Sequence, residues 1–393
     1  MIPKLRLKRE KESLINRKHP WIFSGAVKNM TPAEVGELCE VVGEKGDFLA
    51  FGFVNPSATI ACRVLSYDPQ FSYLSFIEDR LTAAYEEKKS LLGDLEQAAY
   101  RLVNAEADGL PGLIIDIYDK VACIQITLLA IEQRKEHLVS FLTRKLGIIA
   151  IYEKSTAAAR KIEGLPSTSG WLAGSIPAGE RVFIKEHGLL YGVAIETGQK
   201  TGFFIDQRDM RFLARRLSAG RSVLNCFAYT GGFSINALAG GATRVVSLDT
   251  SESACRLNEE NTKQNGFDDK HEILCQDVYD YLKNSKETFD LIILDPPPFV
   301  KKANDLRQGS RHYLELQRLG FSRLKKGGIL FSFSCSPFMP SEDFHRVVSQ
   351  AATSAGKQVK VLTEHHHAFD HGVLLSHPEG GYLKGIVVKE VAF

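Results

Sequence analysis

The sequence lacks Cys-x-x-Cys pairs, and its seven cysteines are scattered and odd in number. This argues against a disulfide framework or a zinc ribbon and favours a reducing cytoplasmic location. No apolar run approaches the about 18 residues that cross a bilayer. The charged N-terminus has no apolar stretch behind it, so neither a membrane association nor a secretory signal is expected. A chain of 393 residues, 44% hydrophobic and 24% charged, is instead typical of a globular protein with two to three domains.

The net charge is only +2, so a nucleic-acid partner would have to be bound by local patches. Two such patches exist. Residues 1–30 contain eight Lys or Arg against two Glu, and residues 299–326 contain eight against one Asp and one Glu. Either window alone is equally well explained as a solvated surface. Together they favour contacts to a phosphate backbone.

The chain divides by pattern into three predicted domains. Residues 1–74 carry short apolar stretches separated by turn residues, which predicts a small β-rich module. Residues 75–190 predict a central α/β domain with a helix at 75–95, strands at 112–118 and 121–129, a helix at 131–145 and a strand at 148–154. Residues 164–181 are rich in Gly, Ser and Pro and predict a loop. The third domain, residues 191–393, follows a strand predicted at 189–196.

From about residue 220 the strands and helices alternate regularly, which predicts an α/β fold with a mostly parallel sheet covered on both faces. The short connection before the last strand lacks a helical period, so that strand is expected to be antiparallel. The strands are predicted at 221–227, 244–249, 271–275, 289–295, 328–335, 359–364 and 382–388, and the helices at 232–239, 251–264, 278–283, 309–325 and 341–354.

Ligand-binding groups follow four consecutive strands of this sheet, at the carboxyl ends where doubly wound folds bind ligands. They are Gly231-Gly232, Asp249, Asp277 and Asp295. Each group alone also fits a plain helix-opening turn or a helix cap. The sequence has no Gly-x-Gly-x-x-Gly, which disfavours a dinucleotide and favours a nucleoside without phosphates, such as S-adenosylmethionine.

Several motifs also carry a family resemblance over nearly the whole chain. They are HPWIFSGAV, RLVNAEADGLPGLIIDIY, TGFFIDQRDMR, NCFAYTGGFS, VVSLDTSESA, DLIILDPPPFV, ILFSFSCS and PEGGYLKG. In combination and order they resemble the class I methyltransferases that make 5-methylcytosine in large-subunit (23S) ribosomal RNA. The resemblance implies an N-terminal PUA-type RNA-binding module, a central domain of strand-strand-helix-strand-strand type and a C-terminal Rossmann-like methyltransferase domain.

The resemblance also implies roles for cofactor-binding residues. The methionine part of S-adenosylmethionine would be wrapped by Phe227, Ala228, Tyr229, Thr230 and Gly231. Asp249 would hold the ribose and Asp277 the adenine. The stretch of Asp206, Gln207 and Arg208 would lie over the pocket, although Asp206 and Arg208 fit an ion pair between domains equally well.

Cytosine carbon 5 is a weak nucleophile, and a thiolate that adds to carbon 6 activates it. Cys335 ends the fifth strand of the predicted sheet, where Ser334, Ser336 and Pro337 indicate that the strand leaves the core. The alternative is a buried, inert cysteine. Asp295 is expected to bind or protonate ring nitrogen 3.

Related enzymes often carry a second cysteine after an Asp-Pro-Pro motif, whereas this chain has Pro297 and Pro298. The acceptor of the carbon 5 proton is therefore open between water and Asp295. Cys226 is expected to be a packing residue.

Basic residues after Asp295 are predicted to contact RNA phosphates beside a flipped base, with Phe299 as a stacking surface. They are Lys301, Lys302, Arg307 and Arg311. The histidines at 365–367, 371 and 377 have no metal-site spacing and are interpreted as loop and surface residues, so no metal is expected.

Three rival functions are left open by the sequence. The first is methylation of a ring or exocyclic nitrogen of guanine or adenine, in which the Asp-Pro-Pro turn holds the base amine. The second is a non-catalytic RNA-binding or ribosome-assembly factor, and the third, disfavoured by the missing glycine fingerprint, is a nicotinamide dehydrogenase. A homodimer is also left open.

Overall fold

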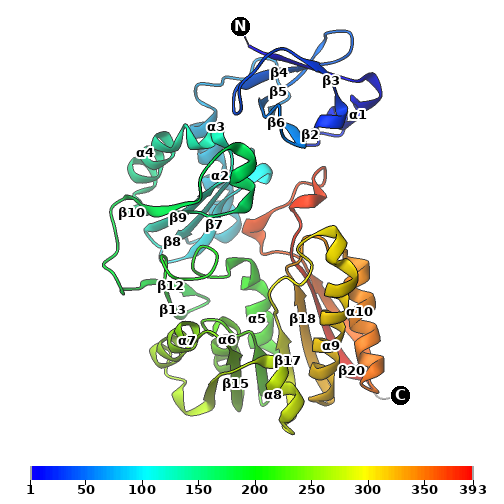
Figure 1. Ribbon diagram of the computed structural model, residues 1–393. Helices are drawn as coiled ribbons and strands as arrows, with labels where there is room; N and C mark the ends of the chain where they lie inside the picture. Colours follow the sequence, from blue (N-terminus) through cyan, green and yellow to red (C-terminus); the bar gives the residue numbers. More distant parts are fainter. Residues whose placement is uncertain (1, 392–393) are drawn as a thin grey trace. The chain divides into compact units, whose positions relative to one another are not determined.

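The computed structural model describes residues 2–391, and the chain within it forms two compact units (Figure 1). The first unit comprises Met1–Val182, Val193–Gly202 and Phe369–Gly380. The second comprises Phe183–Gly192, Phe203–Ala368 and Gly381–Phe393. The domain boundaries predicted near residues 74 and 190 stay predictions.

The first unit begins with a six-stranded sheet in the order β2-β6-β5-β4-β1-β3. Its inward-facing side chains, such as Leu5, Ile22 and Val41, are fully buried in one core. The predicted β-rich module is therefore present. The strands are β1 (Lys4–Leu7), β2 (Trp21–Phe23), β3 (Val27–Met30), β4 (Leu38–Val42), β5 (Phe48–Val54) and β6 (Ile60–Ser66).

A second sheet of the first unit has the order β11-β10-β9-β8-β7. The loop predicted at 164–181 is wrong in its middle, where β11 (Thr168–Ala173) pairs antiparallel with β10. The strand begins with Thr-Ser-Gly, and its apolar residues Trp171, Leu172 and Ala173 are consecutive, so the sequence shows no alternation of apolar and polar residues. The remaining elements are α2 (Phe76–Leu92), β7 (Ala99–Asn104), β8 (Leu113–Tyr118), β9 (Val121–Ile126), α3 (Leu129–Glu132), α4 (Lys135–Leu146) and β10 (Ala150–Ser155).

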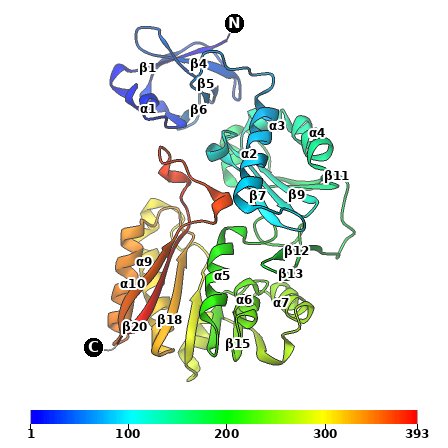
Figure 2. The ribbon, with the colours of Figure 1, turned by 180° about the vertical axis from the view of Figure 1, so that it is seen from behind.

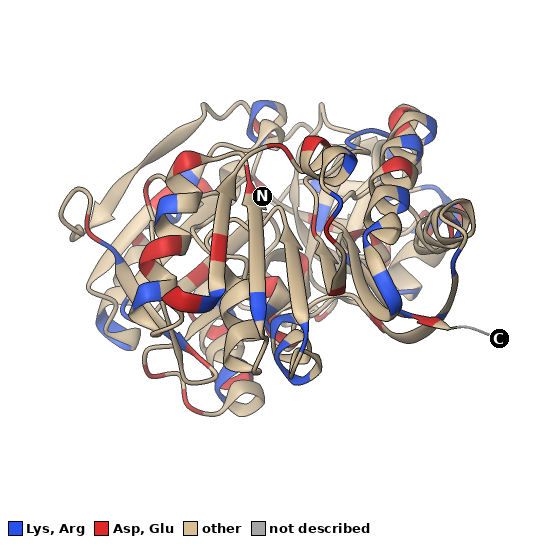
Figure 3. Cartoon of the chain, turned by 90° about the horizontal axis from the view of Figure 1, so that it is seen from below, with Lys and Arg blue, Asp and Glu red and all other residues tan. Residues whose placement is uncertain are grey.

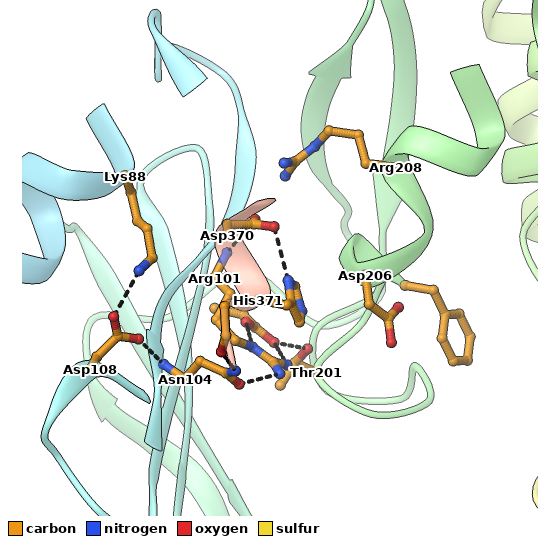
Figure 4. Close-up of polar contacts among 12 residues, drawn as sticks. Lys88, Arg101, Asn104, Asp108, Thr201, Asp206, Arg208, Asp370 and His371 are labelled. Carbon is orange, nitrogen blue, oxygen red and sulfur yellow. Dashed lines mark hydrogen bonds and ion pairs between the residues drawn. The ribbon is translucent and has the colours of Figure 1, made fainter. Parts of the chain in front are cut away.

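Two distant chain segments are tied to this second sheet by a buried polar network (Figure 4). The Arg101 guanidinium donates to both carboxylate oxygens of Asp116, at 2.8 and 3.0 Å. Thr201, from the segment 193–202, donates its hydroxyl to Asp116 at 2.6 Å. Asp370, from the segment 369–380, accepts the backbone N–H of Arg101 at 3.0 Å. These segments are therefore held by buried hydrogen bonds to the sheet as well as by packing.

The second unit is built on a seven-stranded sheet in the order β16-β15-β14-β17-β18-β20-β19. Neighbouring strands from β16 to β18 are parallel, and β20 is antiparallel to both β18 and β19. The predicted antiparallel last strand is thus confirmed. The strands are β14 (Ser222–Cys226), β15 (Arg244–Asp249), β16 (His271–Cys275), β17 (Phe289–Leu294), β18 (Leu324–Ser334), β19 (Gln358–His365) and β20 (Lys384–Val391).

Helices cover both faces of this sheet (Figures 1 and 2). Alternate strand residues point to opposite faces, so Val223 packs in one core and Leu224 in the other. One face carries α5 (Arg208–Leu217), α6 (Gly232–Ala239) and α7 (Glu252–Gln264), and the other α8 (Val278–Asn284), α9 (Leu306–Ser322) and α10 (Ser341–Ser354). The Arg-rich α5 was not predicted, and neither was β12 (Val182–Glu186), which pairs with β13 (Leu189–Val193).

Charges of both signs are interspersed along the chain, as expected from its small net charge (Figure 3). Between residues 2 and 391, no helix combines the length and the apolar character needed to span a membrane.

Candidate active site

A tight turn leaves the carboxyl end of β14 and leads into α6. Its backbone has positive φ angles at Phe227 (59°), Tyr229 (48°) and Gly231 (85°), a conformation that non-glycine residues rarely adopt. The N–H of Ala228 is anchored to the carbonyl of Leu248 in β15 at 2.9 Å. Strained backbone of this kind often marks a functional site.

Two asparagines of α7 contact this turn and support it. Neither was predicted from the sequence. Asn261 donates its side-chain amide to the carbonyl of Thr230 at 3.1 Å. Asn258 packs closely on Gly231. A Cβ atom added to Gly231 would lie 2.6 Å from the Cγ atom of Asn258. Both asparagines are about 1% exposed, which an amphipathic helix pattern would not predict.

The predicted ribose ligand, Asp249, lies beside the turn. One carboxylate oxygen accepts the N–H of Tyr229 at 2.8 Å and the other accepts the N–H of Ser251 at 2.9 Å. Asp277 lies one strand further along, at the start of α8, where it caps the helix by accepting the N–H of Asp280 at 3.0 Å. Its side chain is exposed at the edge of the site.

The stretch 206–208 reaches the same end of the sheet. Gln207 donates its amide to the carboxylate of Asp295 at 3.2 Å, and Asp206 accepts the hydroxyl of Tyr382 at 2.6 Å. Arg208 lies 3.9 Å from the Glu186 carboxylate. The structure therefore brings Gln207 to Asp295, whereas Arg208 pairs away from it.

Asp295 and Cys335 follow the adjacent parallel strands β17 and β18. The Cys335 thiol lies 3.7 Å from the carbonyl oxygen of Pro296, the residue after Asp295. It is neither deeply packed nor fully exposed. Cys226, in contrast, is completely buried, and burial raises the pKa of its thiol well above the usual value. The two predicted catalytic residues are thus neighbours.

Two further side chains, neither of them predicted from the sequence, hold the end of β18. The buried phenol of Tyr313 in α9 lies 2.9 Å from the hydroxyls of both Ser334 and Ser336. Burial raises the pKa of Tyr313 to about 12, so it stays neutral. Lys384 donates its ammonium to the Ser336 carbonyl at 2.8 Å.

The predicted RNA-binding cations are all exposed. Lys301 and Lys302 precede α9, whereas Arg307 and Arg311 lie one turn apart on it. Phe299 is half-buried, and its ring lies 4.7 Å from that of Tyr313. Its predicted role as a stacking surface stays a prediction.

The interpretation of the C-terminal histidines as surface residues is wrong for three of them. His365, His371 and His377 are 8%, 2% and 5% exposed. His365 packs against Phe333 at the end of β19, and His371 bonds to Asp370. Their burial comes from contacts with distant residues, which local pattern does not reveal. Within residues 2–391 no group of three or more His, Cys, Asp or Glu is arranged to hold a metal.

Comparison with known proteins is consistent with this geometry. Residues 156–359 match the S-adenosylmethionine-dependent methyltransferase family, and residues 5–67 match the PUA-like domain. The class is therefore a methyltransferase that carries a PUA-like domain and uses S-adenosylmethionine as its methyl donor. More narrowly, the chain belongs to the family of ribosomal RNA large subunit methyltransferase I.

Two relatives and one solved structure match over nearly their full lengths. Ribosomal RNA large subunit methyltransferase I of Cronobacter sakazakii is 39% identical, with 98% of each chain covered. The Escherichia coli O139:H28 protein of the same name is 38% identical, with 99% of this chain and 100% of the relative covered. A protein assigned as a methyltransferase and solved with SAH has a TM-score of 0.85 at 24% identity, with 99% and 100% coverage, and supports the fold.

The residues at this end of the sheet fit the cofactor. The side-chain carbonyl oxygen of Gln207 is buried without a hydrogen-bond partner, which is an acceptor available to a bound group. Asp249 retains lone pairs for ribose hydroxyls beyond the two backbone N–H groups it accepts.

Proposed function

We propose that this methyltransferase modifies carbon 5 of a cytosine in large-subunit (23S) ribosomal RNA through a covalent adduct with Cys335. The observation that carries the proposal is the half-exposed Cys335 thiol, 3.7 Å from the Pro296 carbonyl and next to Asp295. The names of the relatives support ribosomal RNA as the substrate. Such a substrate also implies a cytoplasmic location.

The chain's own residues would act in the following order. The Cys335 thiolate adds to cytosine carbon 6, forming a sulfur–carbon bond and shifting the carbon 5–carbon 6 π electrons toward carbon 5. Asp295 stabilises the charge that develops at ring nitrogen 3. S-adenosylmethionine supplies an electrophilic methyl group. Water or Asp295 then accepts the carbon 5 proton, and the sulfur–carbon bond breaks with its electron pair returning to sulfur.

The cofactor would be held by the turn of β14 and its surroundings. In this proposal the backbone of residues 227–231 contacts the methionine part, Asp249 the ribose and Asp277 the adenine edge. Gln207 lies over the pocket with Asp206, and Arg208 fixes this stretch through Glu186. The exposed cations at 301, 302, 307 and 311 bind the phosphates that flank the target base.

The test compares Cys335→Ser with Cys275→Ser, a change at the exposed cysteine near the adenine side. Each variant is incubated with S-adenosylmethionine and an RNA containing 5-fluorocytosine, and a denaturation-resistant protein–RNA complex is measured alongside methylation of unmodified RNA. We expect wild type and Cys275→Ser to form the complex and to methylate, and Cys335→Ser to do neither while still binding S-adenosylmethionine.

The other outcomes separate the rival functions. Methylation that survives Cys335→Ser would mean nitrogen methylation, because attack by a base amine needs no thiolate. Binding of RNA and S-adenosylmethionine without turnover in wild type would mean an assembly factor.

A further inference from the structure

A buried lysine lies beside the end of β18 that carries Cys335. Lys384 is the first residue of β20 and pairs in register with Ser334, the residue before Cys335. It is only 6% exposed. Its ammonium donates to two backbone carbonyls, those of Ser336 at 2.8 Å and Tyr382 at 3.1 Å. The ammonium is thus held against the backbone of Ser336, the residue after Cys335.

The partners of this ammonium are unusual, because buried lysines are normally paired with carboxylates. Among residues 2–391, no carboxylate lies within ion-pair distance of the Lys384 nitrogen. Two neutral carbonyls orient the ammonium without cancelling its charge. Burial lowers the pKa of Lys384 to about 8, and the nearby Cys335 acts in the opposite direction, favouring the charged lysine. The same pairing favours the thiolate of Cys335.

We propose that Lys384 is a positioning residue that stabilises the Cys335 thiolate with its positive charge. This inference rests on the proposed function, in which the thiolate is the nucleophile that adds to cytosine. When the thiolate forms, the sulfur–hydrogen bond breaks, the proton goes to solvent and the electron pair stays on sulfur. The neighbouring ammonium lowers the free energy of that anion.

The other titratable groups around the nucleophile do not supply this charge. Tyr313 faces it from α9 as a neutral phenol. Asp295, after β17, is an acidic side chain and supplies no positive charge. Burial lowers the pKa of His365, at the end of β19, to about 4, so it is neutral at pH 7. Of these groups, only Lys384 is positive at neutral pH.

The test measures the pH dependence of Cys335 alkylation by iodoacetamide, quantified by mass spectrometry of the Cys335 peptide. It needs neither RNA nor cofactor. In wild type, we expect the midpoint for Cys335 to lie below that of the exposed Cys275 in the same sample. In Lys384→Gln, which keeps hydrogen-bond donors but loses the charge, the Cys335 midpoint should rise by at least one pH unit, a tenfold loss of thiolate at low pH. Lys384→Arg should restore most of the shift.

The Cys275 profile is the internal control and should be unchanged in every variant. A Cys335 midpoint that is the same in wild type and in folded Lys384→Gln would overturn the proposal. If Lys384→Gln does not fold, the wild-type comparison decides it, because a Cys335 midpoint at or above that of Cys275 is equally incompatible with a stabilised thiolate.

A second readout separates this inference from the proposed function. Trapping of 5-fluorocytosine RNA by Lys384→Gln should be at least tenfold slower than wild type at pH 7 and should recover by pH 9, whereas a purely structural defect would be independent of pH. If wild type forms no trapped complex at all, the proposed function fails, and the alkylation result still reports the effect of Lys384 on the thiol.

Discussion

Because Asn258 packs on the turn of β14, a substitution of Gly231 tests how tightly this turn is packed. Gly231→Ala places a methyl group 2.6 Å from the Asn258 Cγ and closer still to its amide oxygen, in backbone with φ of 85°. The left-handed conformation costs a non-glycine residue about 1–2 kcal/mol. Displacing a short, buried side chain adds about 1–3 kcal/mol. We therefore expect a total destabilisation of about 2–5 kcal/mol.

The chain offers a matched control in Gly241, which has the same φ of 85° but whose nearest neighbour, the Cα of Ala219, lies 3.8 Å from the added methyl position. Gly241→Ala should therefore cost only the conformational part, about 1–2 kcal/mol. The difference between the variants isolates the contact with Asn258. In the double variant Gly231→Ala with Asn258→Ala, the two effects should be less than additive, because the clash is removed.

The assay must report on the second unit specifically. The two tryptophans, Trp21 and Trp171, both lie in the first unit, so their fluorescence does not follow the site. Amide hydrogen exchange of α6 and α7 gives the free energy of opening at the turn. S-adenosylmethionine affinity is measured in parallel and should fall in Gly231→Ala but not in Gly241→Ala. Equal opening free energies in the two variants would refute the packing argument.

Three other perturbations have defined outcomes. Asp116→Ala leaves the Arg101 guanidinium buried without its carboxylate and should cost the first unit about 3–5 kcal/mol, measured by urea unfolding with tryptophan fluorescence; an unchanged midpoint would contradict this. Burial lowers the pKa of His271 to about 4 in the folded protein, whereas its pKa in the unfolded chain is about 6.5. As the pH falls, the unfolded chain therefore binds a proton at His271 before the folded protein does. Stability should then drop between pH 6.5 and 4 by up to about 1.4 kcal/mol per unit, and thermal unfolding of His271→Gln should have a shallower pH dependence than wild type. Tyr313→Phe removes the phenol that bonds to the hydroxyls of Ser334 and Ser336. It should lower the stability by about 1–3 kcal/mol in thermal unfolding and should slow RNA trapping. Unchanged stability and unchanged trapping would show that the phenol does not hold the end of β18.

The regular α/β part was predictable because its parallel strands are buried on both faces. Strands such as β17 therefore appear as continuous apolar runs that end at turn residues. The carboxyl ends of such strands meet at one edge, so Asp295 and Cys335 could be expected as neighbours from their order alone. These are local signals combined with one rule of topology.

Features that depend on distant contacts were missed. Asn258 and Lys384 are polar residues that a pattern assigns to solvent, and each is buried only because a turn or a strand end from elsewhere in the chain covers it. The apolar residues of the half-buried strand β11 are consecutive, so they give no period-2 signal. The burial of His371 likewise follows from the docking of residues 369–380 on the first unit, which no short-range pattern encodes.

The interleaved connectivity has a consequence for modular exchange. The backbone passes between the two units five times, at residues 182, 192, 202, 368 and 380. A chimera joined at residue 182 would therefore separate Thr201 and Asp370 from the Arg101–Asp116 pair to which they bond. A graft of the N-terminal portion onto another catalytic chain has to carry both inserted segments, or the recipient loses buried hydrogen bonds.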